Sequence, residues 1–399
     1  MNRDFVASTN DLVERVLRGN WRTGSRGQID YAYSSPSPHR YPWQWYWDSC
    51  FAAIVWRRFD RERARAELQT LLGAQRPDGF IGHTIFWDRP VTLLRFAFYN
   101  VLSRDALQTE TIQPPLLAWA WKIAVGDPAS EPRIAAQADW LAENRDLEGD
   151  GLLWIVQPDE SGLDASPKFD PVWGRSANGQ IGFPLLVRRN RGRRFDARRV
   201  LADGGPVLCE VLTNVLWSLS LQALGRPSAT PALIERLWDE DSGLFLDEAA
   251  PSGQRPNVST IASLAPLALP DLPEEIGRRM VEEHLLDPER YWTAVPPPSV
   301  AADEPGFEPG GGSRLIRRYW RGPTWVNTAW LVWLGLRRLG YDAQAAQMTE
   351  ALAAAAAREG LREYYDPRTG AGLGARDFAW SALLAEMTDP DPAAENSWL

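Results

Sequence analysis

The sequence contains few of the residues that usually build metal centres or nucleophilic dyads. Its 399 residues include only two cysteines and three histidines, and His39, His83 and His284 stand far apart without metal-ligand spacing. A G-x-S-x-G nucleophile elbow, a P-loop and a G-x-G-x-x-G dinucleotide motif are all missing. We therefore expect no metal site, no serine-hydrolase chemistry and no nucleotide chemistry. Cys50 and Cys209 lie in apolar stretches, and we expect them to be buried free thiols in a reducing compartment.

The sequence also lacks an excess of positive charge and any long apolar run. Lys and Arg total 43 against 52 Asp and Glu, which gives a formal net charge of −9 and a pI of about 5.1. A field of this sign repels phosphate, so we expect neither a nucleic-acid partner nor an anionic membrane partner. No stretch approaches the roughly 18 apolar residues that a membrane-spanning helix needs. Met1–Phe5 is not followed by the apolar core of a signal peptide, which makes the cytoplasm the expected location.

Tryptophan, in contrast, is abundant, with 20 residues in the chain. Many of them stand beside glycine, proline and acidic residues instead of at helical spacing, as in the run YPWQWYWD at Tyr41–Asp48. Indole faces stack well on the C–H faces of sugars, while nearby carboxylates accept hydrogen bonds from sugar hydroxyls. Some tryptophans will fill the core, but the pattern favours a small-molecule carbohydrate as the partner of this protein.

Helical patterns dominate the chain. Tight Asp/Gly turns follow several of the predicted helices, as in Pro77–Gly82 and Asp241–Leu246. Recurring helical hairpins predict an all-α fold, either an open solenoid or a closed α/α toroid, and long loops between helices favour the closed form. Apolar residues recur at i, i+3, i+4 and i+7 in segments 10–17, 48–58, 60–73, 113–125, 131–144, 209–224, 229–238, 257–268, 273–285, 324–339, 342–358 and 376–387.

Two segments depart from this helical pattern. Asp146–Gly151 resembles the start of a calcium-binding loop, but position twelve is Gln157 where such a loop needs Glu, so we interpret it as a turn. Residues 292–314 are too rich in proline and glycine for a helix. This segment could be a linker between domains or an active-site loop. We favour the loop because the chain returns directly into the aromatic cluster Arg318–Trp325.

Acidic residues gather among aromatic residues in three clusters, Trp45–Asp48, Pro158–Ser166 and Arg362–Pro367. Hydrolysis of a glycosidic bond needs one protonated carboxyl group and one ionised carboxylate. Aromatic walls raise the pKa of the acid by desolvation, and neighbouring carboxylates raise it further. From spacing alone, a role as a turn residue or a helix cap explains each acid as well as a catalytic role does.

These clusters carry a resemblance to a known family. Four motifs occur in the order found in glycoside hydrolase family 63 and the related trehalase family, which makes the combined signal specific. The motifs are Gln44–Phe51 (QWYWDSCF), Glu160–Pro167 (ESGLDASP), Tyr319–Asn327 (YWRGPTWVN) and Glu363–Gly372 (EYYDPRTGAG).

The resemblance implies an (α/α)6 toroid with long active-site loops on one face, formed by one catalytic domain over residues 1–399. It also implies an inverting α-glycosidase that needs no cofactor and no metal, with Asp164 as general acid and Glu363 as general base. Asp48 matches the acid that holds sugar hydroxyls in the deepest subsite. Further substrate-binding positions carried over or expected nearby are Tyr41, Trp45, Trp47, Trp87, Gln113, Glu160, Tyr319, Trp320, Arg321, Trp325 and Trp380.

Within this family, the chain resembles the bacterial mannosylglycerate and glucosylglycerate hydrolases. Such substrates carry a carboxylate that an arginine pair could hold, and Arg198 and Arg199 lie in the matching part of the chain. A solvated basic loop is the alternative reading of these arginines. The chain departs from the pattern at Asp159, where many relatives have an aromatic residue, and at Lys168, where arginine is common.

Two other functions compete with hydrolysis. A non-catalytic sugar-binding α/α protein could share the fold, but loss of a catalytic carboxyl group would be its simplest signature and both are present. A sugar isomerase or epimerase would be expected to use histidines near pH 7, and His83 is the only histidine near a motif. The sequence carries no prediction of the oligomeric state.

Overall fold

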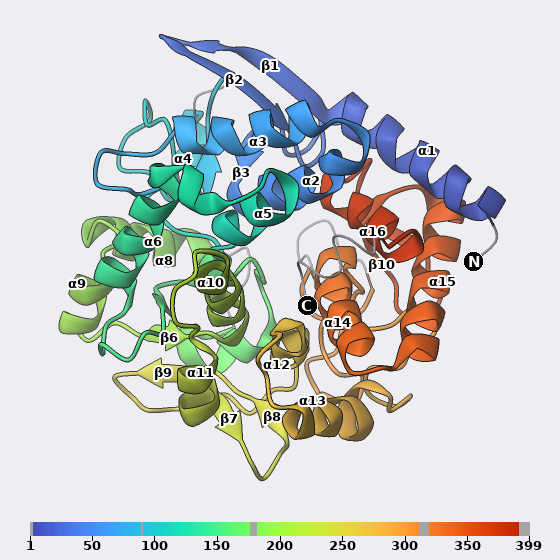
Figure 1. Ribbon diagram of the computed structural model, residues 1–399. Coiled ribbons are helices and arrows are strands. Elements are labelled where there is room, and N and C mark those ends of the chain that lie inside the picture. The colour runs from blue at the N-terminus through green and yellow to red at the C-terminus, as the bar shows by residue number, and fades with distance from the viewer. Residues whose placement is uncertain (1–2, 89–90, 176–181, 311–318, 391–399) are drawn as a thin grey trace.

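The structure is a computed structural model that describes residues 3–88, 91–175, 182–310 and 319–390. Helices dominate this part of the chain, and short strands form five small sheets within it. Figure 1 shows the helices arranged around a common centre, with one set facing the centre and a second set outside it. The expected predominance of helices is therefore confirmed.

Six helical segments of the described chain surround the centre. They are buried on nearly all sides, which is typical of helices enclosed by neighbours. In α2, for example, every residue from Tyr46 to Trp56 is buried. The inner segments are α2 (Tyr46–Phe59), α5 (Leu117–Ala124), α10 (Val211–Ala223), α12 (Ile261–Leu264) with the 3-10 helix η4 (Ala265–Ala268), α14 (Val326–Arg338), and the 3-10 helix η6 (Ala379–Leu383) with α16 (Leu384–Thr388).

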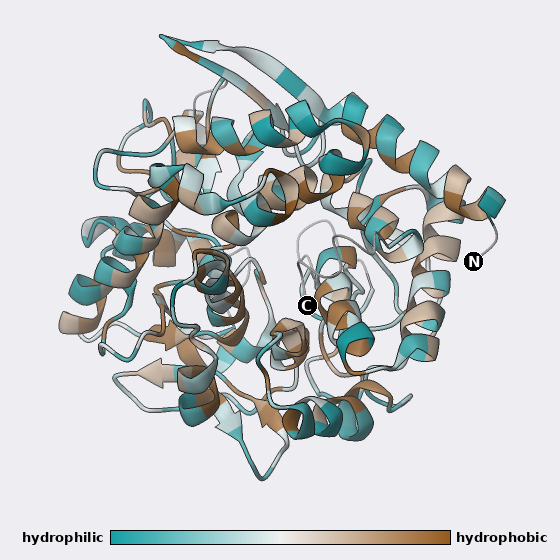
Figure 2. Ribbon diagram, in the orientation of Figure 1, coloured by the Kyte–Doolittle hydropathy of each residue, from teal (hydrophilic) through white to brown (hydrophobic). Residues whose placement is uncertain are grey.

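A second layer of helices packs on the outside of the first. Each outer helix contacts an inner segment: α3 contacts α2, α6 contacts α5, α11 contacts α10, α13 contacts η4, α15 contacts α14, and α1 contacts η6 and α16. Figure 2 shows hydrophilic residues on the outward faces of these helices. The outer helices are α1 (Arg3–Asn20), α3 (Arg61–Gly73), α6 (Pro132–Arg145), α11 (Thr230–Leu237), α13 (Glu274–Met280), which continues as the π-helix η5 (Val281–Leu285), and α15 (Asp342–Glu359).

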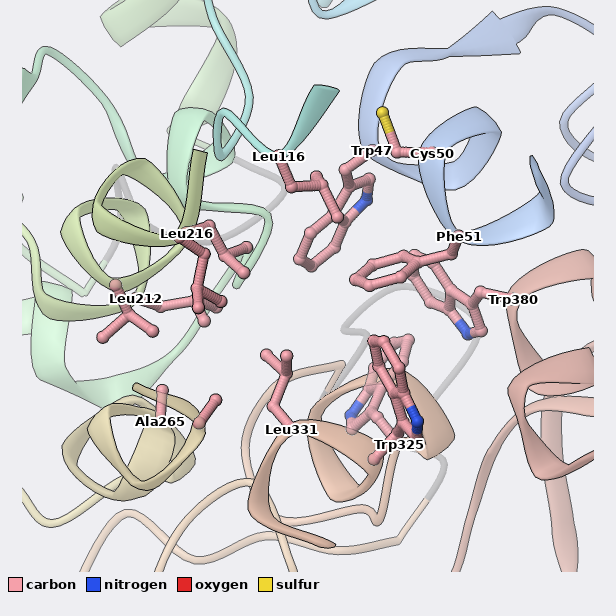
Figure 3. Packing of buried hydrophobic residues seen from close by; sticks show 14 of the residues in the cluster. Trp47, Cys50, Phe51, Leu116, Leu212, Leu216, Ala265, Trp325, Leu331 and Trp380 are labelled. Carbon is pink, nitrogen blue, oxygen red and sulfur yellow. The ribbon is translucent and has the colours of Figure 1, made fainter. Parts of the chain in front are cut away.

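Contacts between neighbouring inner segments run in a circle. They lead from α2 to α5, α10, η4, α14 and η6, and from η6 back to α2. Figure 3 shows side chains of the inner helices, where Trp47, Phe51 and Leu331 point toward the centre from different helices. These residues belong to one continuous hydrophobic cluster. The centre of the ring is therefore a packed core at this level.

Strands and short helices make up the connections. The hairpin β1–β2, which the sequence analysis did not predict, pairs Trp21 with Ser34 and turns at Gly27, whose φ of 63° glycine adopts without strain. The strands are β1 (Trp21–Arg26), β2 (Ile29–Ser34), β3 (Gln44–Trp45), β4 (Thr84–Ile85), β5 (Trp154–Ile155), β6 (Val207–Cys209), β7 (Trp238–Asp239), β8 (Leu244–Phe245), β9 (Glu248–Ala250), β10 (Arg362–Tyr365) and β11 (Gly372–Arg376). The short helices are α4 (Leu93–Phe96), η1 (Pro128–Ser130), η2 (Pro158–Ser161), η3 (Pro167–Phe169), α7 (Asp170–Trp173), α8 (Phe183–Gly192) and α9 (Ala197–Ala202).

The segment that resembles a calcium loop is a turn, as expected. The Asp146 carboxylate accepts the backbone N–H groups of Gly149 and Gly151. The neighbouring acids Glu148 and Asp150 both pair with the guanidinium of Arg236. Local hydrogen bonds and one arginine thus use the carboxylates that a cation would need.

Two further expectations can be compared with the described residues. Cys50 and Cys209 are both buried and free, as predicted from their apolar surroundings. No helix in the described ranges combines the length and the apolar character that crossing a membrane requires.

The Pro- and Gly-rich segment packs against the regions that carry the motifs. A backbone bridge joins Pro298 to Thr324, and Gly306 lies against the ring of Pro167. Part of residues 292–310 therefore lies against η3, which directly follows the loop that contains Asp164. The last part of the predicted segment, residues 311–314, falls outside the described residues.

Candidate active site

The candidate site lies where several inner segments begin. Asp48 lies in the first turn of α2, Trp325 directly precedes α14, and Trp380 lies in η6. Glu363 comes from β10, which pairs with β11 just before η6. The loop between η2 and η3 contributes Asp164. The fold thus brings together residues that are more than 300 positions apart in the sequence.

Glu363 is held rigidly. Its side chain is fully buried, and Oε1 accepts hydrogen bonds from the hydroxyls of Tyr41 at 3.0 Å and Tyr319 at 3.1 Å. Oε2 accepts the backbone N–H of Ala375 at 2.7 Å. A Cβ atom on Gly374 would lie 2.5 Å from Oε2, so only glycine fits beside the carboxylate. Three donors on one carboxylate give it a fixed orientation.

Asp48 is a buried acid that lacks a full set of partners. It is 3% exposed, and its Oδ1 has no hydrogen-bond partner among the described residues. Burial and the negative charge of Glu363 raise the pKa of Asp48 well above its usual range. A buried polar atom without a partner is uncommon in folded proteins. Asp48 therefore has the acceptor capacity that a bound hydroxyl could use.

Asp164 lies in a tight loop and is partly buried. Gly162, two residues earlier, has φ of 74° and presses on the indole of Trp47, which a Cβ atom would approach to 2.5 Å. The charges of Glu363 and Asp164 both help to raise the pKa of Tyr319, after burial and the effect of Tyr41. The Tyr319 phenol therefore lies close to both carboxyl groups, which places them around one site.

Aromatic side chains form the wall of this site. The indoles of Trp320 and Trp325 stack with centroids 3.8 Å apart and planes at 7°. Trp380 lies edge-on to both Trp47 and Trp325, at 5.4 Å and 5.6 Å between centroids, and Figure 3 shows these three indoles from close by. Trp45 extends the wall, since it contacts the ring of Tyr41 at 5.9 Å. Seven of the predicted aromatic positions are thus in one assembly: Tyr41, Trp45, Trp47, Tyr319, Trp320, Trp325 and Trp380.

Three other residues that were predicted to bind substrate form specific contacts within the protein. Gln113 accepts the backbone N–H of Trp47 through Oε1 at 3.0 Å. Arg321 donates to both oxygens of Asp170. Trp87 donates to Gln44 and stacks on a tyrosine of the β1–β2 hairpin. Gln113 therefore supports Trp47 of the wall, Arg321 joins its own segment to α7, and Trp87 packs away from the aromatic assembly.

Glu160 requires a correction. Its Oε1 accepts from Arg145 Nη2 and the N–H of Ile112, and its Oε2 accepts from Arg145 Nη1 and the N–H of Val156. A carboxylate has about four acceptor positions, and all four are used. Glu160 is also fully buried. It therefore anchors its loop, whereas its place in the motif had led us to expect that it binds substrate.

The contacts of Arg198 and Arg199 distinguish the two readings of this arginine pair. Arg198 donates to the backbone carbonyls of Glu143 and Asp146, and Arg199 pairs with Asp196. Both belong to α9, which packs on the outer helix α6 at the periphery of the ring. The alternative reading of this tract as a solvated basic surface fits the structure better.

Sequence reasoning missed two aromatic residues of the assembly. The ring of Tyr364 lies 4.4 Å from that of Trp325, and Phe378 lies 4.6 Å from Trp380 and 5.9 Å from Tyr41. Both stand within two residues of a predicted site residue. The signal that could have identified Tyr364 is its place in the same motif as Glu363.

The motifs, the paired buried acids and the aromatic wall define a glycoside hydrolase. Comparison with known proteins gives the family: the mannosylglycerate hydrolase MGH1-like glycoside hydrolase domain matches residues 41–225 and 222–381, and the chain belongs to this family. Mannosylglycerate hydrolases from Thermus thermophilus and Rubrobacter radiotolerans are each 31% identical to it. The alignments cover 89% and 94% of this chain, respectively, and 96% of each relative.

Solved structures agree with this assignment. The family 63 mannosylglycerate hydrolase from Thermus thermophilus, in complex with Tris, superimposes with a TM-score of 0.80 at 28% identity, covering 95% of this chain and 99% of that one. Further structures of the enzyme contain Tris with D-glycerate, or glucose. A glucosylglycerate hydrolase from Mycolicibacterium hassiacum is 25% identical over 90% of this chain.

Proposed function

We propose that this chain is an inverting α-glycosidase that hydrolyses small glycerate glycosides, namely mannosylglycerate or glucosylglycerate. The reaction class rests on the family, and the aglycone on the relatives that carry these names. The observation that supports the mechanism best is the environment of Tyr319, whose phenol donates to Glu363 and lies in the field of Asp164.

In the proposed reaction, the protonated carboxyl of Asp164 donates its proton to the glycosidic oxygen as the C1–O bond breaks. The Glu363 carboxylate takes a proton from a water molecule, whose oxygen bonds to C1 on the opposite face. The products are the free sugar with inverted configuration and the free aglycone. The next substrate needs Asp164 protonated and Glu363 ionised again, which exchange with solvent restores.

The other residues of the site have supporting parts in this proposal. The hydroxyls of Tyr41 and Tyr319 orient the Glu363 carboxylate. Asp48 accepts hydroxyls of the sugar through its unpartnered oxygen. The indoles of Trp47 and Trp320 offer apolar faces to the C–H groups of the ring, and Trp325 supports Trp320 by stacking on it.

The fold and the surroundings of the protein complete the proposal. Six inner segments, each with an outer partner, support an (α/α)6 toroid that forms one catalytic domain. Buried free Cys50 and Cys209 suit a reducing compartment and support a cytoplasmic location. The proposed partner is a small-molecule carbohydrate, with no cofactor, metal, nucleic acid or membrane surface.

The alternative of an isomerase or epimerase finds little support at His83. Burial lowers the pKa of its imidazole to about 3, so the ring is neutral near pH 7 and is a poor proton donor there.

The test is a panel of α-mannosides and α-glucosides, including both glycerate glycosides, assayed with wild type, Asp164→Asn and Glu363→Gln. We expect hydrolysis of a glycerate glycoside by wild type and a loss of at least about 100-fold in each variant. Near-normal turnover in both variants would refute the assignment of the two carboxyl groups. Absence of hydrolysis by the folded wild-type protein across the panel would instead favour a sugar-binding protein.

A further inference from the structure

The loop that carries Asp164 has a strained backbone. Ala165, the next residue, has φ of 65°, a left-handed conformation that costs a residue with a Cβ about 1 kcal/mol or more. Gly162, two residues before Asp164, is also left-handed, with φ of 74°, but glycine adopts this conformation without strain. The conformation of Ala165 persists only where the surrounding structure enforces it. Something must therefore hold both ends of this loop.

Before Asp164, the loop is fixed by a buried ion pair. Arg145, the last residue of α6, forms two parallel hydrogen bonds with Glu160, at 2.8 Å and 2.6 Å. The side chains are only 2% and 0% exposed. The Glu160 carboxylate also accepts the N–H groups of Ile112 and Val156, so one acid ties three segments together.

After Asp164, the loop is fixed by a second buried charge cluster. The ammonium group of Lys168 pairs with Glu210 and with Asp247, at 3.0 Å to the latter, and all three side chains are at most 3% exposed. Glu210 caps α10 by accepting the N–H of Thr213 at 2.6 Å. Asp247 accepts the N–H of Val211 at 2.9 Å. Lys168 thereby joins the loop to the start of an inner helix and to the turn before β9.

These clusters are a costly way to stabilise a fold. Removing two charges from water costs several kcal/mol per ion, and buried pairs are often no more stabilising than apolar residues of the same volume. Burial alone would lower the pKa of Lys168, but the charges of Asp247 and Glu210 outweigh it and raise that pKa, so the ammonium group stays charged. Such clusters instead favour a single geometry, because a movement of either partner breaks the ion pair and leaves a buried charge unpaired.

We propose that Arg145–Glu160 and Lys168–Glu210–Asp247 form a clamp, four residues on either side of Asp164, which imposes the left-handed Ala165 and so aims the acid at the glycosidic oxygen. Lys168 and Ala165 are thus positioning residues for proton donation. This inference rests on the proposed function, since it assumes that Asp164 is the general acid. It assigns no part of the clamp to Glu363, which is held by the tyrosines and β11.

The consequence is a selective defect when the clamp is weakened. An alkyl leaving group such as glycerate needs a proton from the acid, whereas fluoride leaves a glycosyl fluoride without one and still needs the base-activated water. A misplaced acid therefore slows hydrolysis of the glycerate glycoside but spares the fluoride. A general loss of structure slows both reactions equally.

The experiment compares kcat/KM for mannosylglycerate and α-mannosyl fluoride, or for the glucosyl pair if wild type prefers it. Ala165→Gly is the main variant, because glycine removes no contact of the clamp but gives the backbone beside Asp164 access to other conformations, which disperses the orientation of the acid. We expect its melting temperature to equal or exceed that of wild type. Its activity on the glycerate glycoside should fall about 10-fold or more while activity on the fluoride changes less than about threefold.

Two variants of Lys168 and one control complete the design. Lys168→Met should reduce the glycerate-glycoside rate about 100-fold with the fluoride rate largely kept, and Lys168→Arg should restore most of it. The control is Arg57→Met, which breaks a buried ion pair with Glu386 between α2 and α16. It should lower the melting temperature without changing the ratio of the two rates.

The possible outcomes distinguish a failure of the clamp proposal from a failure of the proposed function. If wild type hydrolyses both substrates but Ala165→Gly and Lys168→Met lower both rates equally, the clamp does not position the acid. If wild type hydrolyses the fluoride but no glycoside, the proposed function itself fails. An unfolded Lys168→Met protein leaves Ala165→Gly to decide, and an unchanged rate ratio there would overturn the inference.

Discussion

The phenol of Tyr319 donates a 3.1 Å hydrogen bond to Oε1 of Glu363, and that oxygen also accepts the Tyr41 hydroxyl at 3.0 Å. The same phenol lies in the field of Asp164. One tyrosine thus connects the proposed base with the surroundings of the proposed acid. Tyr319 has φ of 39°, so its backbone is left-handed as well. The site combines strained backbone with buried charge, a combination that is typical of functional centres.

Removing the Tyr319 hydroxyl should impair catalysis more than binding. In Tyr319→Phe, Glu363 loses one of its three hydrogen bonds, and a hydrogen bond to a charged group contributes about 1.5–3 kcal/mol, which corresponds to a loss of about 10- to 100-fold in kcat. Steady-state kinetics would measure it. Tyr291→Phe is the matched control, because its buried hydroxyl pairs with that of Ser259 and not with a proposed catalytic acid. Equal kcat values for the two variants would contradict the role of Tyr319.

Asp48→Asn should lower activity and raise stability. The substitution removes a buried acid whose pKa is raised by burial and by the charge of Glu363, so the folded protein loses an unfavourable charge. It also weakens an acceptor for sugar hydroxyls, and we expect kcat/KM to fall at least about 10-fold. Thermal unfolding and kinetics on one preparation test both parts. A variant that is both less stable and fully active would show that Asp48 is structural.

Stability should fall as the pH rises through neutrality, with Glu67 as one cause. Burial raises the pKa of this acid from 4.5 to about 8, so the folded state binds its proton more tightly than the unfolded state does. Its contribution is complete below the ordinary carboxyl pKa and is lost as the pH rises toward 8, at up to about 1.4 kcal/mol per pH unit. Urea denaturation at three pH values from mildly acidic to mildly basic should show a shallower decline for Glu67→Gln. Parallel curves for variant and wild type would rule out this contribution.

The double variant Arg198→Ala/Arg199→Ala should hydrolyse a glycerate glycoside with kcat and KM within about twofold of wild type. The two guanidinium groups are exposed and engaged by Glu143, Asp146 and Asp196 on the outer side of the ring. A large rise in KM for glycerate glycosides, with no change for an uncharged glycoside, would instead favour the reading in which they hold the carboxylate.

The sequence could predict the parts of the site that depend on local chemistry. Trp320 and Trp325 belong to one short motif, and the helical periodicity of segments such as 342–358 matches α15 (Asp342–Glu359). These predictions succeeded because they depend only on the types and spacing of residues that lie close together in the sequence. Cys50 and Cys209 were correctly expected to be buried for the same reason.

Partners that are distant in the sequence could not be predicted in this way. The motif predicts that Glu160 binds substrate, but in the fold Arg145 and two backbone N–H groups donate to its carboxylate oxygens. In the sequence, Lys168 is only a departure from the family pattern. The fold shows that it pairs with Glu210 and Asp247. The hairpin β1–β2 was not predicted because its first strand, Trp21–Arg26, is mostly polar and lacks alternation, although Ile29–Ser34 alternates.

The central claim is that Asp164 and Glu363 act on opposite faces of the sugar in a single displacement. The most direct test is proton NMR of the first-formed anomer during hydrolysis of the preferred α-glycoside by wild-type protein, recorded before mutarotation. We predict that the β-anomer appears first, because water attacks opposite the departing glycerate. First appearance of the α-anomer would contradict the account, since retention requires a covalent intermediate on a carboxylate that this arrangement assigns to water activation.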